Sequence, residues 1–373
     1  MPAGPEQQPS PGTPHSPPAA PTDAASSPAH EPGVEPTPNF WPNLLARLAA
    51  HESLTAEETA AAMRAVMLGQ ATQAQMGGFL MALRTKGETA EELEGLAATM
   101  LELAQAVDPP GPVIDTCGTG GDRAGTLNVS TLGAIACAGA GVAVAKHGNR
   151  AASSRCGSAD LLEALGVKID LDPAGVRRCL EQAGIAFMFA PVFHPAMAHA
   201  AVVRRELRVP TAFNFLGPLT NPARPHAQIV GVSDLRMVPL VAEVLARRGT
   251  TALVFRGDDG LDELTTTGPS HVFTVSGGAA TEGELTPEDA GLGRASPDDL
   301  KGGDVGHNVA IARSVLAGDP GPARDVVLLN AGAALWTAGA AGDLRTGVAS
   351  AARSIDSGAA AGALDRWIVA SNA

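Results

Sequence analysis

After residue 112 the sequence alternates between short apolar runs and helical segments, and this alternation limits the possible folds more than any other feature. Five apolar runs end in glycine, proline or polar residues: PVIDTCG, GVAVAKHG, GIAFMFAP, AQIVGVS and TALVFRG. Strands that alternate with helices form a mainly parallel sheet covered by helices on both faces. The sequence therefore predicts an α/β domain, in which ligands bind beyond the carboxyl ends of the strands.

Residues 40–107 have a different pattern, which predicts four short helices and a small all-helical domain. A threonine is followed three residues later by Glu or Gln at three places, as in a capping box. Gly69 and Gly87 lie where helices should end. Pro-Pro-Gly-Pro at 109–112 predicts a linker to the α/β domain, and the chain after about Gly306 is again helical. The three pairs are Thr55 with Glu58, Thr72 with Gln75, and Thr89 with Glu92.

Residues 1–38 differ from both regions, because they hold 12 of the 29 prolines and no Lys or Arg. A signal peptide needs a basic start and an apolar run, and a transit peptide needs arginines. The segment has neither, and its composition is typical of a disordered tail. We assign it no part in the chemistry.

Composition excludes several classes of protein. A net charge of −13 argues against nucleic acid or an anionic membrane as the main partner, because both bind basic surfaces. No apolar stretch approaches the about 20 residues that cross a bilayer. The four cysteines form no CxxC pair, so a structural zinc site is not expected. Scattered thiols suit a reducing compartment and predict a cytoplasmic location.

The segment DTCGTGGDRAGTLNVST, residues 115–131, joins a predicted strand to a predicted helix. Its glycines allow the backbone to approach a ligand, and the helix start offers N–H groups to an anion. Thr126, Ser130 and Thr131 add hydroxyl donors. The alternative is an ordinary glycine-rich turn, with Asn128 or Ser130 as the helix N-cap. The segment is neither a Walker motif nor GxGxxG.

A second segment, KHGNRAASSRCGSADLLEALG at 146–166, also follows a strand and precedes a helix. Lys146 and Arg150 bring positive charge, and Asn149 can donate and accept hydrogen bonds. Three serines add donors. A solvated surface charge is the alternative for each cation, but two consecutive strand ends with the same chemistry favour an anion site. His147 fits a catalytic role or an ordinary loop histidine equally well. The serines are Ser153, Ser154 and Ser158.

Two further segments carry charged groups. GDDGLDELTTTG, residues 257–268, contains four carboxylates after the strand ALVF. Oxygen ligands that share Mg²⁺ with a substrate phosphate are one interpretation, and a solvated acidic turn is the other. The segment 193–223 contains Arg204 and Arg205, which could pair with a carboxylate or favour a helix C-terminus. The four acids are Asp258, Asp259, Asp262 and Glu263.

The motifs DTCGTGGD, NVST, KHGNRAASS, GSADLLEALG, FHPAM, TAFNFLGPLTNPA and GLDE resemble, in order and spacing, the anthranilate phosphoribosyltransferases. The resemblance covers roughly residues 40–370. It implies a helical domain at 39–108 with a contribution from about 194–208, an α/β domain at 109–373, a cleft between them and a homodimer. It also implies transfer of phosphoribose from phosphoribosyl pyrophosphate to the amine of anthranilate, without a covalent nucleophile or an assigned catalytic base. This is the second step of tryptophan biosynthesis from chorismate.

The resemblance also implies roles for individual residues. Two Mg²⁺ ions are expected at Ser130, Asp262 and Glu263, and anthranilate at Gly118, Asn149 and Arg204. The residues expected to contact phosphoribosyl pyrophosphate are Gly118, Gly121, Asp122, Thr126, Asn128, Val129, Ser130, Thr131, Lys146, His147, Gly148, Asn149, Arg150, Ala151, Ala152, Ser153, Ser154 and Ser158.

The sequence departs from the commonest pattern of this family at a few positions. Arg208 stands where a glycine is usual, and Pro210-Thr211 replaces Arg-Thr. Cys117 replaces an aliphatic residue and is expected to fill a small buried space. Two alternative functions stay open at this stage: a pyrimidine-nucleoside phosphorylase of the same superfamily, and a non-catalytic relative that binds nucleic acid.

Overall fold

The computed structural model describes residues 1, 2, 4, 38–151 and 155–373. Most of the proline-rich segment 1–38 therefore lies outside the described residues. So do Ala152, Ser153 and Ser154, three of the residues expected to contact the sugar diphosphate.

The four helices predicted for residues 40–107 are present. All three predicted capping boxes form, with each threonine hydroxyl accepting a hydrogen bond from the backbone N–H three residues later. Gly69 and Gly87 follow helices with φ of 70° and 90°, which a glycine adopts without strain. Trp41 and Phe79 pack edge to face in the bundle core, with ring centroids 5.9 Å apart. The helices are α1 (Phe40–Ala49), α2 (Ala56–Met67), α3 (Gln73–Lys86) and α4 (Ala90–Glu102).

The rest of the chain is built around a seven-stranded sheet in the order β3-β2-β1-β4-β5-β6-β7. The first five strands in this order are parallel, as predicted, and the last two are antiparallel. The antiparallel hairpin was not predicted, although Gly277-Gly278 is a dipeptide typical of a two-residue hairpin turn. The strands are β1 (Ile114–Gly118), β2 (Val144–Gly148), β3 (Ile185–Phe189), β4 (Ala227–Gly231), β5 (Thr251–Gly257), β6 (Ser270–Ser276) and β7 (Ala279–Leu285).

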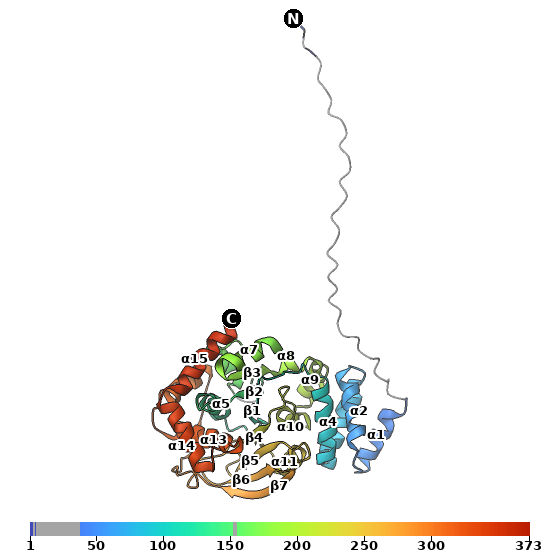
Figure 1. Ribbon diagram of the computed structural model, residues 1–373. Helices are drawn as coiled ribbons and strands as arrows, with labels where there is room; N and C mark the ends of the chain where they lie inside the picture. The colour runs from blue at the N-terminus through green and yellow to red at the C-terminus, as the bar shows by residue number, and fades with distance from the viewer. Residues whose placement is uncertain (3, 5–37, 152–154) are drawn as a thin grey trace. The chain divides into compact units, whose positions relative to one another are not determined.

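Helices cover both faces of this sheet (Figure 1). The first helices after β1 are α5 (Val129–Gly139), α6 (Ser158–Ala164), α7 (Pro173–Ala183), α8 (Ala190–Phe193), η1 (Pro195–Met197) and α9 (Ala198–Leu207). They are followed by α10 (Phe213–Leu216), η2 (Gly217–Leu219), η3 (Leu235–Met237), α11 (Val238–Arg247) and η4 (Pro297–Leu300). The C-terminal helices are α12 (Val305–Leu316), α13 (Pro322–Thr337), α14 (Leu344–Asp356) and α15 (Ala359–Asn372).

The two faces of the sheet belong to two separate hydrophobic cores. Ile229 and Leu253 point into a core that includes α5 and α13. The adjacent Val230 and Val254 point into a second core, which also contains α11 and the N-terminal bundle. Neighbouring strand residues face opposite sides, so this alternation follows from strand geometry. The helical bundle is thereby continuous with one face of the sheet.

The sheet has one topological switch point, between β1 and β4. From β1 the chain proceeds to β2 and β3 on one side, and then returns to β4 and β5 on the other. At such a point the loops beyond the strands diverge and leave a crevice for ligands. On the bundle side, α9 packs against α2 and α3. Within the described residues, no helix is both long and apolar enough to cross a bilayer.

Candidate functional site

The glycine-rich segment begins at the switch point. Gly118 and Gly231 lie opposite each other in the β1–β4 ladder, and the Thr119 N–H donates to the Gly231 carbonyl at 2.9 Å. A Cβ atom at either glycine would overlap atoms of Asp262. Both positions therefore require glycine, because the loop after β5 lies directly across these strand ends.

Asp262 is held in this crevice as a buried carboxylate. Its Oδ2 accepts a hydrogen bond of 2.6 Å from the Gly120 N–H. Burial and then the nearby Asp122 carboxylate raise the pKa of Asp262 to about 7. Asp122 has one buried oxygen, Oδ2, with no hydrogen-bond partner among the described residues. Neither acid forms an ion pair with a Lys, Arg or His side chain among the described residues.

Glu263, in the loop after β5, contacts the start of α5. Its Oε1 accepts a 3.3 Å hydrogen bond from the Ser130 N–H. Lys146, which is 1% exposed, donates through Nζ to Ser130 Oγ at 3.2 Å and to the Thr116 carbonyl. Burial, followed by the charge of Asp262, raises the pKa of Glu263, and Lys146 opposes this shift. The structure thus brings Ser130, Asp262 and Glu263 together.

The other two acids of this loop do not join the crevice. Asp259 Oδ2 accepts hydrogen bonds of 2.6 Å from the hydroxyls of both Thr265 and Thr267, which closes a turn. Asp258 is exposed. In the described residues, no three His, Cys, Asp or Glu side chains form a metal-binding group. Mg²⁺ commonly uses one or two carboxylates and completes its shell with water and substrate phosphates, and Asp262 with Glu263 fits that donor set.

The second predicted anion segment begins beside the first, where β2 ends. Arg150 does not face an open site: its guanidinium pairs with Asp160 at 3.0 Å and Glu163 at 2.9 Å. Asp160 also accepts from the N–H groups of Ala151 and Gly157 at 3.0 and 2.9 Å. Arg150 and Asp160 therefore hold the ends of this loop against α6.

Asn128 occupies the N-cap of α5, but its side chain makes no capping hydrogen bond. Its Nδ2 donates to the Cys156 carbonyl at 3.1 Å, and its Oδ1 accepts from Asn308 Nδ2 at 2.8 Å. Asn128 is therefore the N-cap residue, as the alternative had it, but its side chain connects the two glycine-rich segments instead of capping the helix. Ser130 is not the N-cap, because it lies inside α5.

His147 and His194 form a buried pair with ring centroids 5.1 Å apart. His147 Nδ1 lies 3.2 Å from the Gly217 carbonyl, and His194 Nε2 lies 2.9 Å from the Thr220 carbonyl. Burial, then His194, lowers the pKa of His147 to about 3, so its ring is neutral at pH 7. A carbonyl only accepts, so the proton is on Nδ1 and leaves His147 Nε2 as a buried acceptor without a partner among the described residues.

Arg204 lies on α9 with its Cζ 5.6 Å from the centroid of the Phe213 ring. Neither Arg204 nor Arg205 forms an ion pair within the described ranges. Arg208 ends α9 in the left-handed region, with φ of 52°. A glycine adopts this conformation without steric cost, which explains why a glycine suits this position.

The remaining predicted residues lie on the same two strand ends. Thr131 has a buried hydroxyl without a partner among the described residues, and Val129 is buried at 1% exposure. Thr126 forms an antiparallel bridge with Lys301. Gly121 and Gly148 follow β1 and end β2, respectively, while Ser158 begins α6. Cys117 is buried, as expected for a small filler.

Two residues of the crevice were missed from the sequence. Ser233 follows β4, and its hydroxyl donates to the Gly120 carbonyl at 2.8 Å, while its N–H donates to Thr119 Oγ1 at 3.0 Å. The polar end of AQIVGVS is a signal that could have found it. Asn308 lies on a helix far along the chain, and no local pattern pointed to it.

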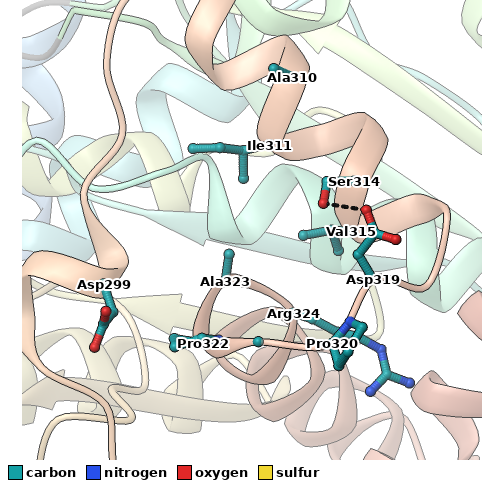
Figure 2. A pocket seen from close by; sticks show the side chains of 11 residues that line it. Asp299, Ala310, Ile311, Ser314, Val315, Asp319, Pro320, Pro322, Ala323 and Arg324 are labelled. Atoms are coloured by element: carbon teal, nitrogen blue, oxygen red, sulfur yellow. Dashed lines mark hydrogen bonds between the residues drawn. The ribbon is translucent and has the colours of Figure 1, made fainter.

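A hollow of about 420 Å³ lies elsewhere, between α12 and the turn that leads into α13 (Figure 2). Ser314 Oγ donates to Asp319 at 2.7 Å on its wall. None of the residues predicted from the sequence lines it, so it is separate from the crevice. Its other lining residues are Asp299, Ala310, Ile311, Val315, Pro320, Gly321, Pro322, Ala323 and Arg324.

Known proteins resemble both parts of this chain. Residues 42–104 match the helical bundle domain of a glycosyl transferase family, and residues 110–361 match its a/b domain. An anthranilate phosphoribosyltransferase of Arthrobacter sp. is 56% identical over 321 residues, which are 84% of this chain and 91% of that protein. The corresponding protein of Saccharopolyspora erythraea is 54% identical over 328 residues, 87% and 93% of the two chains.

Solved structures are similar as well. The anthranilate phosphoribosyltransferase of Thermus thermophilus has a TM-score of 0.84 at 45% identity, covering 88% of this chain and 99% of that one. The Saccharomyces cerevisiae enzyme in complex with phosphoribosyl pyrophosphate and Mg has a TM-score of 0.83 at 28% identity, covering 91% and 99%. The crevice, the two-part fold and these similarities lead to one conclusion: the chain belongs to the anthranilate phosphoribosyltransferase family.

Proposed function

We propose that the crevice beyond β1 and β4 is where this chain transfers phosphoribose from phosphoribosyl pyrophosphate to the amine of anthranilate. The products are N-(5-phosphoribosyl)anthranilate and pyrophosphate, in the second step of tryptophan biosynthesis from chorismate. One observation carries the assignment of the site. The buried Asp262 and the half-buried Glu263 meet the glycine-rich segment and the start of α5 at the switch point of the sheet.

Ser130, Asp262 and Glu263 would hold Mg²⁺, and we propose two ions in the complete site. The raised pKa values of both carboxylates support this, because they indicate buried negative charge that a divalent cation would compensate. Mg²⁺ bound there would neutralise charge that develops on the leaving pyrophosphate. Backbone N–H groups of the glycine-rich segment and the start of α5 would stabilise the same charge from fixed positions.

The residues expected to contact the sugar diphosphate keep that role in the proposal, with one distinction. Gly118, Gly121, Thr126 and Thr131 would bind it directly through backbone or hydroxyl groups. Arg150 would act on the second segment indirectly, since its guanidinium is already paired with Asp160 and Glu163.

The anthranilate side would lie toward α9. An exposed Arg204 without a carboxylate partner in the described residues suits the carboxylate of anthranilate. Gly118 and Asn149 would complete this part of the site. His147 Nε2 is a buried acceptor, which suits the amine N–H groups of the substrate. An aryl amine is neutral at pH 7, so the attack on C1 needs no strongly basic side chain.

The arrangement of the whole chain completes the proposal. The bundle at 39–108, with α9, would close over the α/β domain at 109–373, aligning the substrates and excluding water. We propose that the chain works as a cytoplasmic homodimer. The packing of α9 on α2 and α3 supports the assignment of α9 to the helical bundle.

The test is to mix the purified protein with anthranilate, phosphoribosyl pyrophosphate and Mg²⁺, and to follow the loss of anthranilate fluorescence. We expect a loss that needs all three components and stops when EDTA is added. A folded protein that leaves the fluorescence unchanged would contradict the proposal. Release of pyrophosphate, measured in parallel, separates transfer from simple quenching.

A further inference from the structure

A strap from the C-terminal half of the chain lies against the glycine-rich segment. We define the strap as residues 300–304, which join η4 to α12. The Leu300 carbonyl accepts from the Leu127 N–H at 3.1 Å, and the Gly302 N–H donates to the Gly125 carbonyl at 2.8 Å. A Cβ on Gly302 would lie 2.7 Å from the Thr126 carbonyl oxygen, so the strap needs glycine to approach this closely.

Asn308 extends this contact from the first turn of α12. It is 3% exposed. Its Oδ1 accepts a 2.7 Å hydrogen bond from the Gly303 N–H of the strap. Its Nδ2 donates to Asn128 Oδ1 at 2.8 Å, and Asn128 Nδ2 donates to the Cys156 carbonyl at 3.1 Å. Two asparagines thus link the strap to both glycine-rich segments.

The direction of these hydrogen bonds leaves one orientation for each amide. The Gly303 N–H can only donate, so it requires the oxygen of Asn308. The Cys156 carbonyl can only accept, so it requires the nitrogen of Asn128. Asn128 Oδ1 then faces Asn308 Nδ2, and rotation of either amide would oppose like groups. A buried network in which every member is satisfied keeps a single geometry.

We infer that Asn308 is a positioning residue for the sugar-diphosphate site, holding the segments after β1 and β2 at a fixed spacing through Asn128. This inference rests on the proposed function, because it is the proposed substrate that spans both segments. Asn308 itself is too buried to bind the substrate. Its contribution is preorganisation, which lowers the cost of ordering two loops when the ligand binds.

Two substitutions test this inference on the full chain. Asn308→Ser is neutral and too short to reach Asn128. Asn308→Asp retains an acceptor for the Gly303 N–H but opposes Asn128 Oδ1 with a second oxygen. We expect each to raise the KM for phosphoribosyl pyrophosphate about tenfold, the effect of one buried hydrogen bond. The KM for anthranilate should stay within about twofold in both variants.

The matched control is Ser354→Ala. Ser354 is also 3% exposed, and its hydroxyl donates to the Ala136 carbonyl at 2.8 Å, at the other end of α5. This variant should lose thermal stability without a change in either KM. Binding of phosphoribosyl pyrophosphate to each protein, titrated in the presence of Mg²⁺ and measured by calorimetry, gives a readout independent of turnover.

Each outcome decides. A KM for phosphoribosyl pyrophosphate that rises in both Asn308 variants but not in S354A supports the inference. A KM that rises in N308D alone would overturn the inference, because the effect would then come from the added charge. Unchanged binding of phosphoribosyl pyrophosphate in both variants would also overturn it. Loss of folded protein in both would make Asn308 a folding residue and overturn the inference. An unaltered chain without transferase activity would instead contradict the proposed function.

Discussion

At the scale of single residues, the site depends on carboxylates that the fold holds in an unfavourable place. Asp262 is buried and Glu263 is half-buried, and the positive charge of Lys146 lies near Glu263. Charged groups remain buried only when they are paired or bind a metal. The cost of burying these acids is explained if they work with Mg²⁺ and a diphosphate.

Asp262→Asn should therefore impair catalysis more than folding. We expect kcat/KM to fall about 10²- to 10³-fold, the usual size of a lost electrostatic contact to the transition state. The Mg²⁺ concentration that gives half of the maximal rate should increase. The measurement is the rate at a series of Mg²⁺ concentrations. Asp258→Asn, on the exposed part of the same loop, is the control and should keep the normal rate. Equal losses of kcat/KM in the two variants would contradict the assignment of Asp262 to the Mg²⁺ site.

Arg204→Ala tests the anthranilate side. A charge-assisted hydrogen bond contributes about 1.5–3 kcal/mol, so the KM for anthranilate should rise roughly 10- to 150-fold. The KM for phosphoribosyl pyrophosphate should be nearly unchanged. Arg205→Ala on the same helix is the comparison, and a smaller effect is expected there. If Arg204→Ala raises the KM for both substrates equally, the role of Arg204 is structural.

At the scale of elements, the helical bundle relies on one buried ion pair for the start of α4. The Lys86 and Glu92 side chains are 4% and 0% exposed, and their charged atoms lie 2.9 Å apart. Glu92 also accepts hydrogen bonds from the N–H groups of Leu54 and Thr89, at 2.9 and 2.8 Å. One carboxylate thus completes the capping box and fastens α4 to the loop before α2.

Glu92→Ala should be among the more damaging changes in the bundle. It removes the carboxylate from the buried Lys86 ammonium, which keeps only its hydrogen bonds to the Gly87 carbonyl and Ser53 Oγ, and it leaves two backbone donors unpaired. Breaking a buried ion pair costs about 3–5 kcal/mol. The free energy of unfolding, measured with urea, gives this cost. Glu91→Ala, at the neighbouring exposed position, should change it by less than about 1 kcal/mol. If Glu92→Ala loses no more free energy of unfolding than that control, the remaining hydrogen bonds of Lys86 to Gly87 and Ser53 are sufficient and the ion pair is not needed.

At the scale of the whole molecule, the bundle meets the sheet through a polar cluster as well as a shared core. Arg84 at the end of α3 pairs with Asp234 at 3.0 Å, and Asp234 directly follows Ser233 in the crevice. Glu88 lies in the same cluster, with both carboxylate oxygens buried and unpartnered among the described residues. A movement of the bundle would therefore reach the glycine-rich segment through Asp234.

Glu88 gives the fold a pH dependence whose sign can be stated. Burial raises the pKa of Glu88, although Arg84 and Arg236 oppose this. Stability from the protonated form is complete below the unfolded pKa of about 4.3 and is lost as pH rises through the folded value. Glu88→Gln should therefore raise the melting temperature at pH 7, with a gain that disappears toward pH 4. Melting curves of both proteins between these pH values give the test, and a destabilised variant at pH 7 would contradict it.

Much of the fold was predictable because its signals are local. A capping box is decided within four residues, so Thr55, Thr72 and Thr89 located three helices correctly. The alternation of strands and helices predicted the parallel sheet in the same way. The β6–β7 hairpin was missed, since its outer strand is exposed and lacks the apolar run that marked the others.

In the candidate site, too, local features were predictable and long-range contacts were not. The sequence by itself determined which segments end strands and which residues there suit an anion and Mg²⁺. Only the tertiary structure decided how they combine: Asp262 lies across β1 and β4, Asp259 turns away, and Asn128 is held by Asn308, 180 residues along the chain. Contacts between such distant residues have no period or spacing in the sequence, because they depend on how the elements pack.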